Sequence, residues 1–305
     1  MPKNARPENL HSCQWGKLLV RHTTSISRPN RVKLSLQPLA QNFGLHGSAD
    51  SSWGNPLLPF EQEIITTGKF NAMKLLSREN PVSIDWLSQN GVNVSTVIVR
   101  LMLQDDARAT PTSAWADTGE KVKEFYSKGV RHFELHNEPN TNIEGLGTYW
   151  TNGTTFAAWF IGLANILKNE LPDAKIGWPG LSPGGTISGV RTDWYVFFNE
   201  AVAAGALGLA DWIGCHCYWT TPEDIYNMAA GAHWKNYLKY SKPINVTEYS
   251  NPAPGVLKTD KAHQYLTWFN TLTGVDGAYS FVSSASGNFP YETWTVEMAV
   301  IVGNR

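Results

Sequence analysis

Long apolar stretches are missing from this sequence, and so is the usual signature of export. No segment approaches the roughly 20 consecutive apolar residues that a membrane-spanning helix needs, so we expect no membrane partner. The N-terminus lacks the apolar core of a secretory signal peptide. Two localisations therefore stay open for this chain, the cytoplasm and export with the signal removed.

Cysteine is scarce, because only Cys13, Cys215 and Cys217 occur in 305 residues. Cys215 and Cys217 are two positions apart in an apolar run, so in a strand their side chains share a face and do not form a normal disulfide. No C-x2-C pair at the usual metal-ligand spacing is present. We expect buried free thiols, which weakly favours a reducing compartment, and we expect neither a metal nor another cofactor.

Charge is unevenly distributed along the chain. The whole chain has a net charge of -1 and 42% hydrophobic residues, as in an ordinary globular protein. Residues 1–40, however, carry seven Lys or Arg against one acid, Glu8. This segment is rich in Ser, Pro and Asn, which favours a disordered extension over one that binds nucleic acid or another polyanion. We predict a basic extension at 1–36, a catalytic domain at 37–305 and no nucleic-acid partner.

Eight short apolar runs follow from residue 42, and most are bounded by Gly, Pro, Asn or Asp, as are parallel strands buried on both faces. They cover residues 42–47, 69–77, 94–103, 130–138, 174–180, 211–219, 243–250 and 277–286. Segments with helical patterns lie between them, at 57–67, 81–91, 110–129, 153–172, 191–205, 222–240 and 259–272. This alternation predicts an α/β fold, a single-domain (β/α)8 TIM barrel with a short N-terminal extension. The rival, a doubly wound sheet, often carries a Gly-rich phosphate loop after its first strand, and none is present.

Polar or aromatic side chains gather where these runs end, which in a barrel is where the active site lies. The fourth run ends in Glu138 and the seventh in Glu248, while His46, Trp178 and residues 216–219 end three others. Strands 4 and 7 are three positions apart around a ring of eight, so the two glutamates are expected to face each other across its mouth. Two carboxylates flanking a cleft are the machinery of glycoside hydrolysis, in which one donates a proton and the other attacks or activates water.

Three short motifs make this interpretation more specific: HNEPN at 136–140, H-x-Y at 216–218 and TEYS at 247–250. In this order they resemble glycoside hydrolase clan A, the retaining (β/α)8 glycosidases that include families 5 and 39. The resemblance implies a hydrolase of β-linked oligo- or polysaccharides that acts by double displacement. Glu138 would be the acid/base and Glu248 the nucleophile, with their carboxyl groups about 5–5.5 Å apart.

The same resemblance implies roles for the residues around the two carboxylates. Asn137 would hydrogen-bond the sugar 2-hydroxyl, an interaction that strengthens in the transition state. Tyr218 would hold and tune the nucleophile, and His216 would lie beside it. Both, like His46 and Arg100, are expected to contact the substrate. His46 is either a wall of the site or a core residue.

Two features of the clan A pattern have no single counterpart in this sequence. Clan members often carry a basic residue at the tip of an early strand, and here Arg100 and Lys74 are both candidates. A tryptophan often closes strand 8, but the eighth run lacks one. We expect the stacking platform to come from Trp294, or from Trp178 and Trp219.

Two other functions fit the same residues. A metal-dependent barrel hydrolase would gather the two glutamates with His216 and His46 around an ion, although the strand ends carry lone acids. A non-catalytic sugar-binding barrel would keep the cleft without turnover. Neither the glycan nor endo or exo action follows from the sequence, although aromatic residues in the loops at 48–56 and 140–153 favour an extended substrate.

Overall fold

The computed structural model describes residues 42–49, 53–285 and 287–305. The basic segment at 1–36 and Cys13 lie outside the described residues, so the expectations about them and the domain boundary stay predictions. No helix in the described part of the chain is long and apolar enough to cross a membrane.

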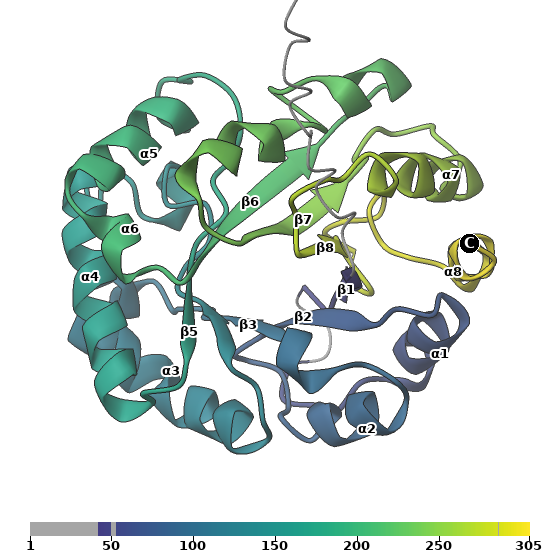
Figure 1. Cartoon of the computed structure of the whole chain (residues 1–305), viewed down its shortest axis with the longest axis horizontal. Coiled ribbons are helices and arrows are strands. Elements are labelled where there is room, and N and C mark those ends of the chain that lie inside the picture. The colour runs from purple at the N-terminus through teal and green to yellow at the C-terminus, as the bar shows by residue number, and fades with distance from the viewer. Residues whose placement is uncertain (1–41, 50–52, 286) are drawn as a thin grey trace, which may run out of the picture. The chain divides into compact units, whose positions relative to one another are not determined.

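Eight parallel strands close into a barrel in sequential order, and helices surround it (Figure 1). The strands are β1 (Asn42–His46), β2 (Ala72–Leu76), β3 (Ile98–Arg100), β4 (His132–Glu134), β5 (Lys175–Trp178), β6 (Trp212–Tyr218), β7 (Ile244–Ser250) and β8 (Gly277–Ser280). Strand β8 pairs in parallel with both β7 and β1, which closes the ring. The predicted (β/α)8 fold is confirmed.

The predicted helices form at six of the seven expected places. The helices are α1 (Pro59–Thr67), α2 (Ser83–Gln89), α3 (Pro111–Ser127), α4 (Gly153–Glu170), α5 (Trp194–Ala203), α6 (Ala206–Leu209), α7 (Lys258–Phe269) and α8 (Val296–Gly303). Side-chain caps begin the two longest of them: the Thr110 side chain accepts a hydrogen bond from Ser113 N, and Asn152 accepts one from Thr155 N.

The helix predicted at 222–240 is wrong. Two short 3-10 helices occupy this segment, η4 (Pro222–Tyr226) and η5 (His233–Tyr240), with turns between them. Asn227 explains the break, because its side chain accepts a hydrogen bond from Ala229 N and its carbonyl accepts from Ala230 N. Such local bonds of an Asn side chain offer the backbone an alternative to the α-helix.

Glycines in β1 and β5 leave space for large aromatic rings in the barrel interior. A side chain on Gly44 would meet the Tyr279 ring at 2.4 Å, and one on Gly177 would meet the Trp212 ring at 2.2 Å. Tyr279 and Trp212 belong to a small buried apolar cluster that is separate from the main core. The barrel interior is therefore a packed core rather than a pore, and it supports the polar residues at the strand ends.

Several strands end earlier than predicted, and for β4 this matters for the site. Strand β4 ends at Glu134, so residues 135–138 continue as a loop beyond it. This loop is tied to the next one, because Glu138 N donates to Gly180 O over 2.9 Å. Glu138 itself has a φ of +34°, in the left-handed region that non-glycine residues rarely adopt. Strand β3 likewise covers only residues 98–100 of the predicted 94–103.

Candidate active site

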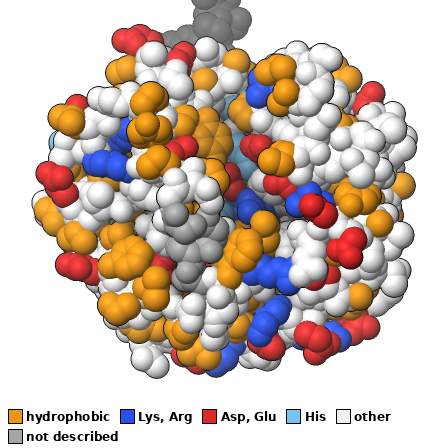
Figure 2. Space-filling model, turned by 180° about the vertical axis from the view of Figure 1, so that it is seen from behind, with side chains coloured by type: hydrophobic (Ala, Val, Ile, Leu, Met, Phe, Trp, Pro, Cys, Tyr) orange, Lys and Arg blue, Asp and Glu red, His pale blue; other side chains and the backbone are white. Residues whose placement is uncertain are grey.

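A cavity of about 600 Å³ opens at the carboxyl ends of the strands. Figure 2 shows it as a hollow in which acidic, basic and histidine side chains meet. Six of the residues named from the sequence line it: His46, Arg100, Asn137, Glu138, Tyr218 and Glu248. They come from the ends of β1, β3, β4, β6 and β7, so the fold brings together residues that are up to 202 positions apart in the chain.

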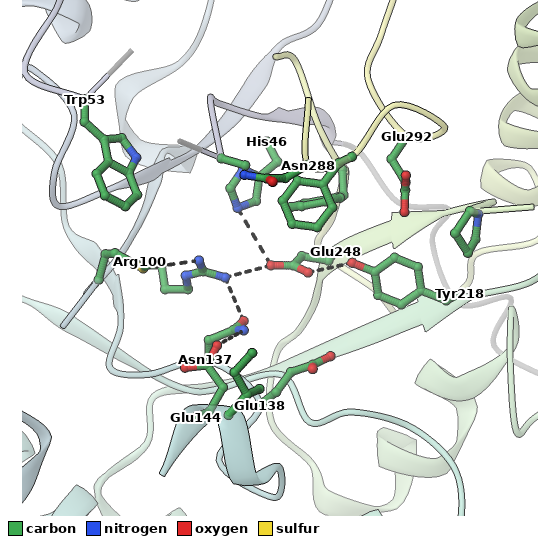
Figure 3. A pocket seen from close by; sticks show the side chains of 16 residues that line it. His46, Trp53, Arg100, Asn137, Glu138, Glu144, Tyr218, Glu248, Asn288 and Glu292 are labelled. Carbon is green, nitrogen blue, oxygen red and sulfur yellow. Dashed lines mark hydrogen bonds and ion pairs between the residues drawn. The ribbon is translucent and has the colours of Figure 1, made fainter. Parts of the chain in front are cut away.

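Glu248 lies at the centre of this arrangement (Figure 3). Its Oε1 atom is 2.9 Å from a guanidinium nitrogen of Arg100 and 3.1 Å from Nζ of Lys74. Its Oε2 atom accepts a 2.6 Å hydrogen bond from the Tyr218 hydroxyl. Both oxygens of this buried carboxylate are therefore held by donors, as a buried charge requires.

The electrostatic surroundings keep Glu248 ionised. Burial alone would raise the pKa of this carboxyl, but the neighbouring His216, Lys74 and Arg100 side chains hold its pKa well below the ordinary value of 4.5. Glu248 is thus a carboxylate at neutral pH, which is the form that a nucleophile or a charge-stabilising group needs.

Arg100 and Lys74 were alternatives for one basic position, and the structure shows that both contact Glu248. Lys74 is fully buried and also pairs with Glu134 at 2.9 Å. Glu134 is in turn fixed by Thr247, whose hydroxyl donates to it over 2.8 Å. The Glu134 carboxylate balances the positive charge of Lys74 and holds its ammonium group where it also contacts Glu248.

Glu138 has a different environment. Its Oε1 atom is 2.9 Å from Nδ1 of His216, and its side chain is 22% exposed where Glu248 is only 6% exposed. His216 is completely buried and approaches Gly180 so closely that any side chain there would meet its ring at 2.3 Å. His216 therefore supports Glu138 from behind and does not line the cavity, which corrects the expected sugar contact.

The same imidazole nitrogen links the two candidate catalytic carboxylates. His216 Nδ1 is 2.9 Å from Glu138 Oε1 and 3.7 Å from Glu248 Oε2. These two oxygens cannot lie farther apart than the sum of the two distances. This upper limit is compatible with the separation of about 5–5.5 Å between the two carboxyl groups of retaining glycosidases. It only reaches the lower end of the range of about 6.5–9.5 Å that is found in inverting glycosidases.

His46 lies against the other side of Glu248. Its Nδ1 atom is 3.0 Å from Gly47 O, and its Nε2 atom is 3.7 Å from Glu248 Oε1. Burial, reinforced by the charge of Lys74, holds the pKa of this imidazole well below its usual 6.5. His46 is therefore neutral at neutral pH and forms a wall of the cavity.

The predicted tryptophan platform is wrong. Trp178 is fully buried and packs against Phe156 and Phe160 of α4, outside the barrel. Trp219 is buried beside Tyr249 and Trp268. Successive strand residues point to opposite faces, so Trp219 turns away from the cavity because its neighbour Tyr218 points into it.

Trp294 does not line the cavity either. It is buried in the helix layer, where its ring meets Phe70 edge-on at 5.0 Å and its indole nitrogen donates to Ser280. The aromatic residue at the end of β8 is instead Phe281, which lines the cavity and meets the His46 ring edge-on at 5.1 Å. Phe289 packs on it from the following loop.

Other cavity residues were not singled out from the sequence, and three of them lie in the loops after β4 and β8. Glu144 and Ile143 come from the loop after β4, and Glu292 comes from the loop after β8. No local pattern marks them, because each lies in a loop whose course depends on long-range contacts. Among the described residues, no group of three or more His, Cys, Asp or Glu side chains is placed to hold a metal ion. Cys215 and Cys217 are buried and free.

Comparisons with known proteins show which solved structures share this fold. No family model matches the chain, and no curated protein matches its sequence. Among solved structures, a family 128 (subgroup II) endo-β-1,3-glucanase from Sorangium cellulosum is similar with a TM-score of 0.59, at 15% identity, over 85% of this chain and 97% of that one.

Two further structures are similar to a comparable extent. An endo-1,4-β-D-mannanase from Thermotoga petrophila has a TM-score of 0.57 at 14% identity, over 86% of this chain and 98% of that one. A family 128 (subgroup IV) endo-β-1,3-glucanase from Lentinula edodes has a TM-score of 0.56 at 17% identity, over 86% of this chain and 98% of that one. The chain has the fold of these glycoside hydrolases.

Proposed function

We propose that the protein is a retaining glycoside hydrolase that cleaves a β-linked glycan by double displacement. The observation that carries this proposal is the pair formed by Glu138 and Glu248. They follow or end β4 and β7, line one cavity and share the nitrogen of a single imidazole, His216. Their environments differ as the two roles require. Glu248 forms ion pairs with Lys74 and Arg100, whereas the Glu138 side chain is partly exposed.

In the first step, a carboxylate oxygen of Glu248 forms a bond to the anomeric carbon while the glycosidic C–O bond breaks. Glu138 gives its proton to the departing oxygen, so the leaving group departs as a neutral alcohol. In the second step, Glu138 removes a proton from water, whose oxygen attacks the anomeric carbon and releases Glu248 as a carboxylate. The enzyme returns to its starting protonation state, and no cofactor takes part in either step.

The surrounding residues have distinct tasks in this scheme. Tyr218 orients the Glu248 carboxylate through its 2.6 Å hydrogen bond. Asn137 lines the cavity beside Glu138 and, in this scheme, binds the sugar 2-hydroxyl. Phe281 and the half-exposed Trp53 supply apolar faces on which sugar rings can stack.

β-1,3-Glucan is the first substrate to test, because two of the three similar structures described above are endo-β-1,3-glucanases. We would measure hydrolysis of laminarin, β-mannan, xylan and aryl β-glycosides by wild type, Glu138→Ala and Glu248→Ala. Glu170→Gln, a partly exposed substitution at the end of α4, is the matched control.

Azide distinguishes the two roles, because it is a small nucleophile that fits the space left by a removed carboxylate. Azide should restore Glu138→Ala activity and yield the β-glycosyl azide, since it attacks the glycosyl-enzyme. It should restore Glu248→Ala activity and yield the α-azide, since it attacks the substrate directly. Wild-type turnover that persists in both variants would contradict the proposal, as would binding without hydrolysis of any of these β-glycans.

A further inference from the structure

We propose that Glu144 is a positioning residue that fixes the side-chain amide of Asn137 for the sugar 2-hydroxyl. This inference rests on the proposed function. Glu144 lies in the 3-10 helix η3 (Asn142–Glu144), in the loop that follows β4. Its carboxylate faces the Asn137 amide, and the two are joined by a hydrogen bond in Figure 3.

The amide of Asn137 is held at both ends. Its Oδ1 atom accepts a 2.7 Å hydrogen bond from Arg100, and its Nδ2 atom donates a 2.8 Å hydrogen bond to Glu144 Oε1. A rotation of the amide by half a turn would set the Asn137 nitrogen against the Arg100 donors and its oxygen against the Glu144 carboxylate. Glu144 and Arg100 together therefore permit only one orientation of this amide.

That orientation leaves one donor for a ligand. Asn137 has two N–H bonds on Nδ2, and only the one to Glu144 has an acceptor among the described residues. Asn137 lines the cavity between Arg100 and Glu138. The second N–H is thus available to a hydroxyl of the sugar that sits over Glu248.

Glu144 is itself held in place. Its Oε2 atom is 3.4 Å from a guanidinium nitrogen of Arg108, which also donates a 2.9 Å hydrogen bond to Ile143 O. Arg108 is only 8% exposed and belongs to η2 (Asp106–Ala109), so it joins the loops after β3 and β4. Gly145 ends the η3 turn with a φ of +121°, which a residue with a side chain rarely adopts. Glu144 therefore cannot swing away without breaking this link.

The contact network separates Glu144 from the chemical step itself. One carboxylate oxygen bonds Asn137 and the other faces Arg108. In the described part of the chain, no hydrogen bond or ion pair joins Glu144 to Glu138 or Glu248. Glu144 lines the cavity, and in this proposal it acts through its hydrogen bond to Asn137. Hydrogen bonds to the 2-hydroxyl strengthen in the transition state, so a misplaced Asn137 amide should lower kcat more than it raises KM.

The kinetic test compares 2,4-dinitrophenyl β-glucoside with its 2-deoxy analogue in wild type, Glu144→Ala and Glu144→Gln. Wild type should strongly prefer the substrate with the 2-hydroxyl. In Glu144→Ala this preference should fall by about tenfold, because the amide loses its orientation. Glu144→Gln keeps an acceptor oxygen for Asn137 and should retain most of the preference.

Glu292→Ala is the matched control, because it removes a carboxylate from the same cavity without touching Asn137. Its preference for the 2-hydroxyl should equal that of wild type whatever its absolute rate. An unchanged preference in Glu144→Ala, with both rates lowered equally, would show that Glu144 only supports the loop and would overturn the proposal.

A second readout does not need turnover, so it separates this inference from the proposed function. In wild type, the Asn137 side-chain NH2 group should give two sharp, well-separated signals in a ¹⁵N spectrum assigned with Asn137→Asp. In Glu144→Ala these signals should broaden or move together, because the amide turns. Melting temperature and circular dichroism would verify that the variant is folded. Unchanged signals in a folded variant would overturn the positioning role, while absent hydrolysis by wild type would overturn only the proposed function.

Discussion

The Tyr218 hydroxyl donates a 2.6 Å hydrogen bond to Oε2 of Glu248, on the side of the carboxylate opposite to Lys74 and Arg100. Burial raises the pKa of Tyr218 well above its ordinary value of 10, and the negative charge of Glu248 adds to the effect. The hydroxyl therefore keeps its proton at any working pH and remains a donor. This hydrogen bond fixes the orientation of the Glu248 carboxylate group relative to the cavity.

Tyr218→Phe is expected to lower kcat by about 10- to 100-fold and to change KM little, because a hydrogen bond to a charged group contributes about 1.5–3 kcal/mol. Steady-state kinetics on the substrate that wild type cleaves would check this. Tyr240→Phe removes a hydroxyl that bonds Asn199 far from the cavity, so its kcat should stay at the wild-type value. A Tyr218→Phe enzyme with full kcat would show that the bond does not orient the nucleophile.

Glu79 provides a prediction about stability and pH. It is buried in the loop after β2, and burial raises its pKa from 4.5 to about 8. The folded protein therefore holds a proton on Glu79 that the unfolded chain loses above pH 4.5. A raised folded-state pKa favours folding at low pH, and this contribution is lost as the pH rises from about 4.5 to about 8.

Glu79→Gln should remove this dependence while keeping an acceptor for Leu76 N. Near pH 5 the variant and wild type should have similar free energies of unfolding. By pH 7.5 the variant should be more stable by up to about 3 kcal/mol, from linkage at about 1.4 kcal/mol per pH unit. Urea unfolding at several pH values would measure the difference, with Glu170→Gln as the surface control. A constant difference across this range would mean that Glu79 titrates in the folded protein as it does when unfolded.

The sequence allows the barrel and its polar rim to be predicted because both follow from local patterns. Parallel strands buried on both faces are short apolar runs, and the residues that end them must lie at the barrel mouth. Glu138, Asn137 and Glu248 are examples, although Glu138 lies in a loop four residues beyond β4. The strand ends themselves could not be predicted, because backbone pairing such as that of Glu138 N with Gly180 O depends on the neighbouring loop.

The predictions for Trp178 and Trp219 were wrong because they considered only that these residues end a strand. Side chains along a strand point alternately to its two faces, and this alternation turns both tryptophans away from the cavity. On β6, Tyr218 points into the cavity, so the next residue, Trp219, must point to the helices. On β5 the same rule applies: the barrel-facing Gly177 makes room for the Trp212 ring, and Trp178 faces outward. Glu144 left no such signal, because its place depends on Arg108 from another loop.

The same alternation explains Phe281 and leads to the last prediction. Tyr279 points into the barrel, and Phe281, two residues later, lines the cavity above it. Phe281 directly follows β8, at the strand end where the resemblance to clan A led us to expect a tryptophan. It lines the cavity with only 8% of its surface exposed, and its ring meets the His46 ring edge-on.

Phe281→Ala should raise KM by about tenfold or more, because an aromatic face contributes roughly 0.5–1.5 kcal/mol beyond the apolar area that it buries. Phe281→Trp should keep the wild-type KM, since it preserves a flat apolar face at the same place. Trp219→Phe, the control for loss of an indole, should leave KM unchanged and lower the melting temperature, because Trp219 packs among Tyr249 and Trp268. Michaelis constants for an oligosaccharide substrate, measured beside melting temperatures, separate these effects. If Trp219→Phe raised KM and Phe281→Ala did not, the platform would lie on β6, and the orientation assigned to both strand ends would be wrong.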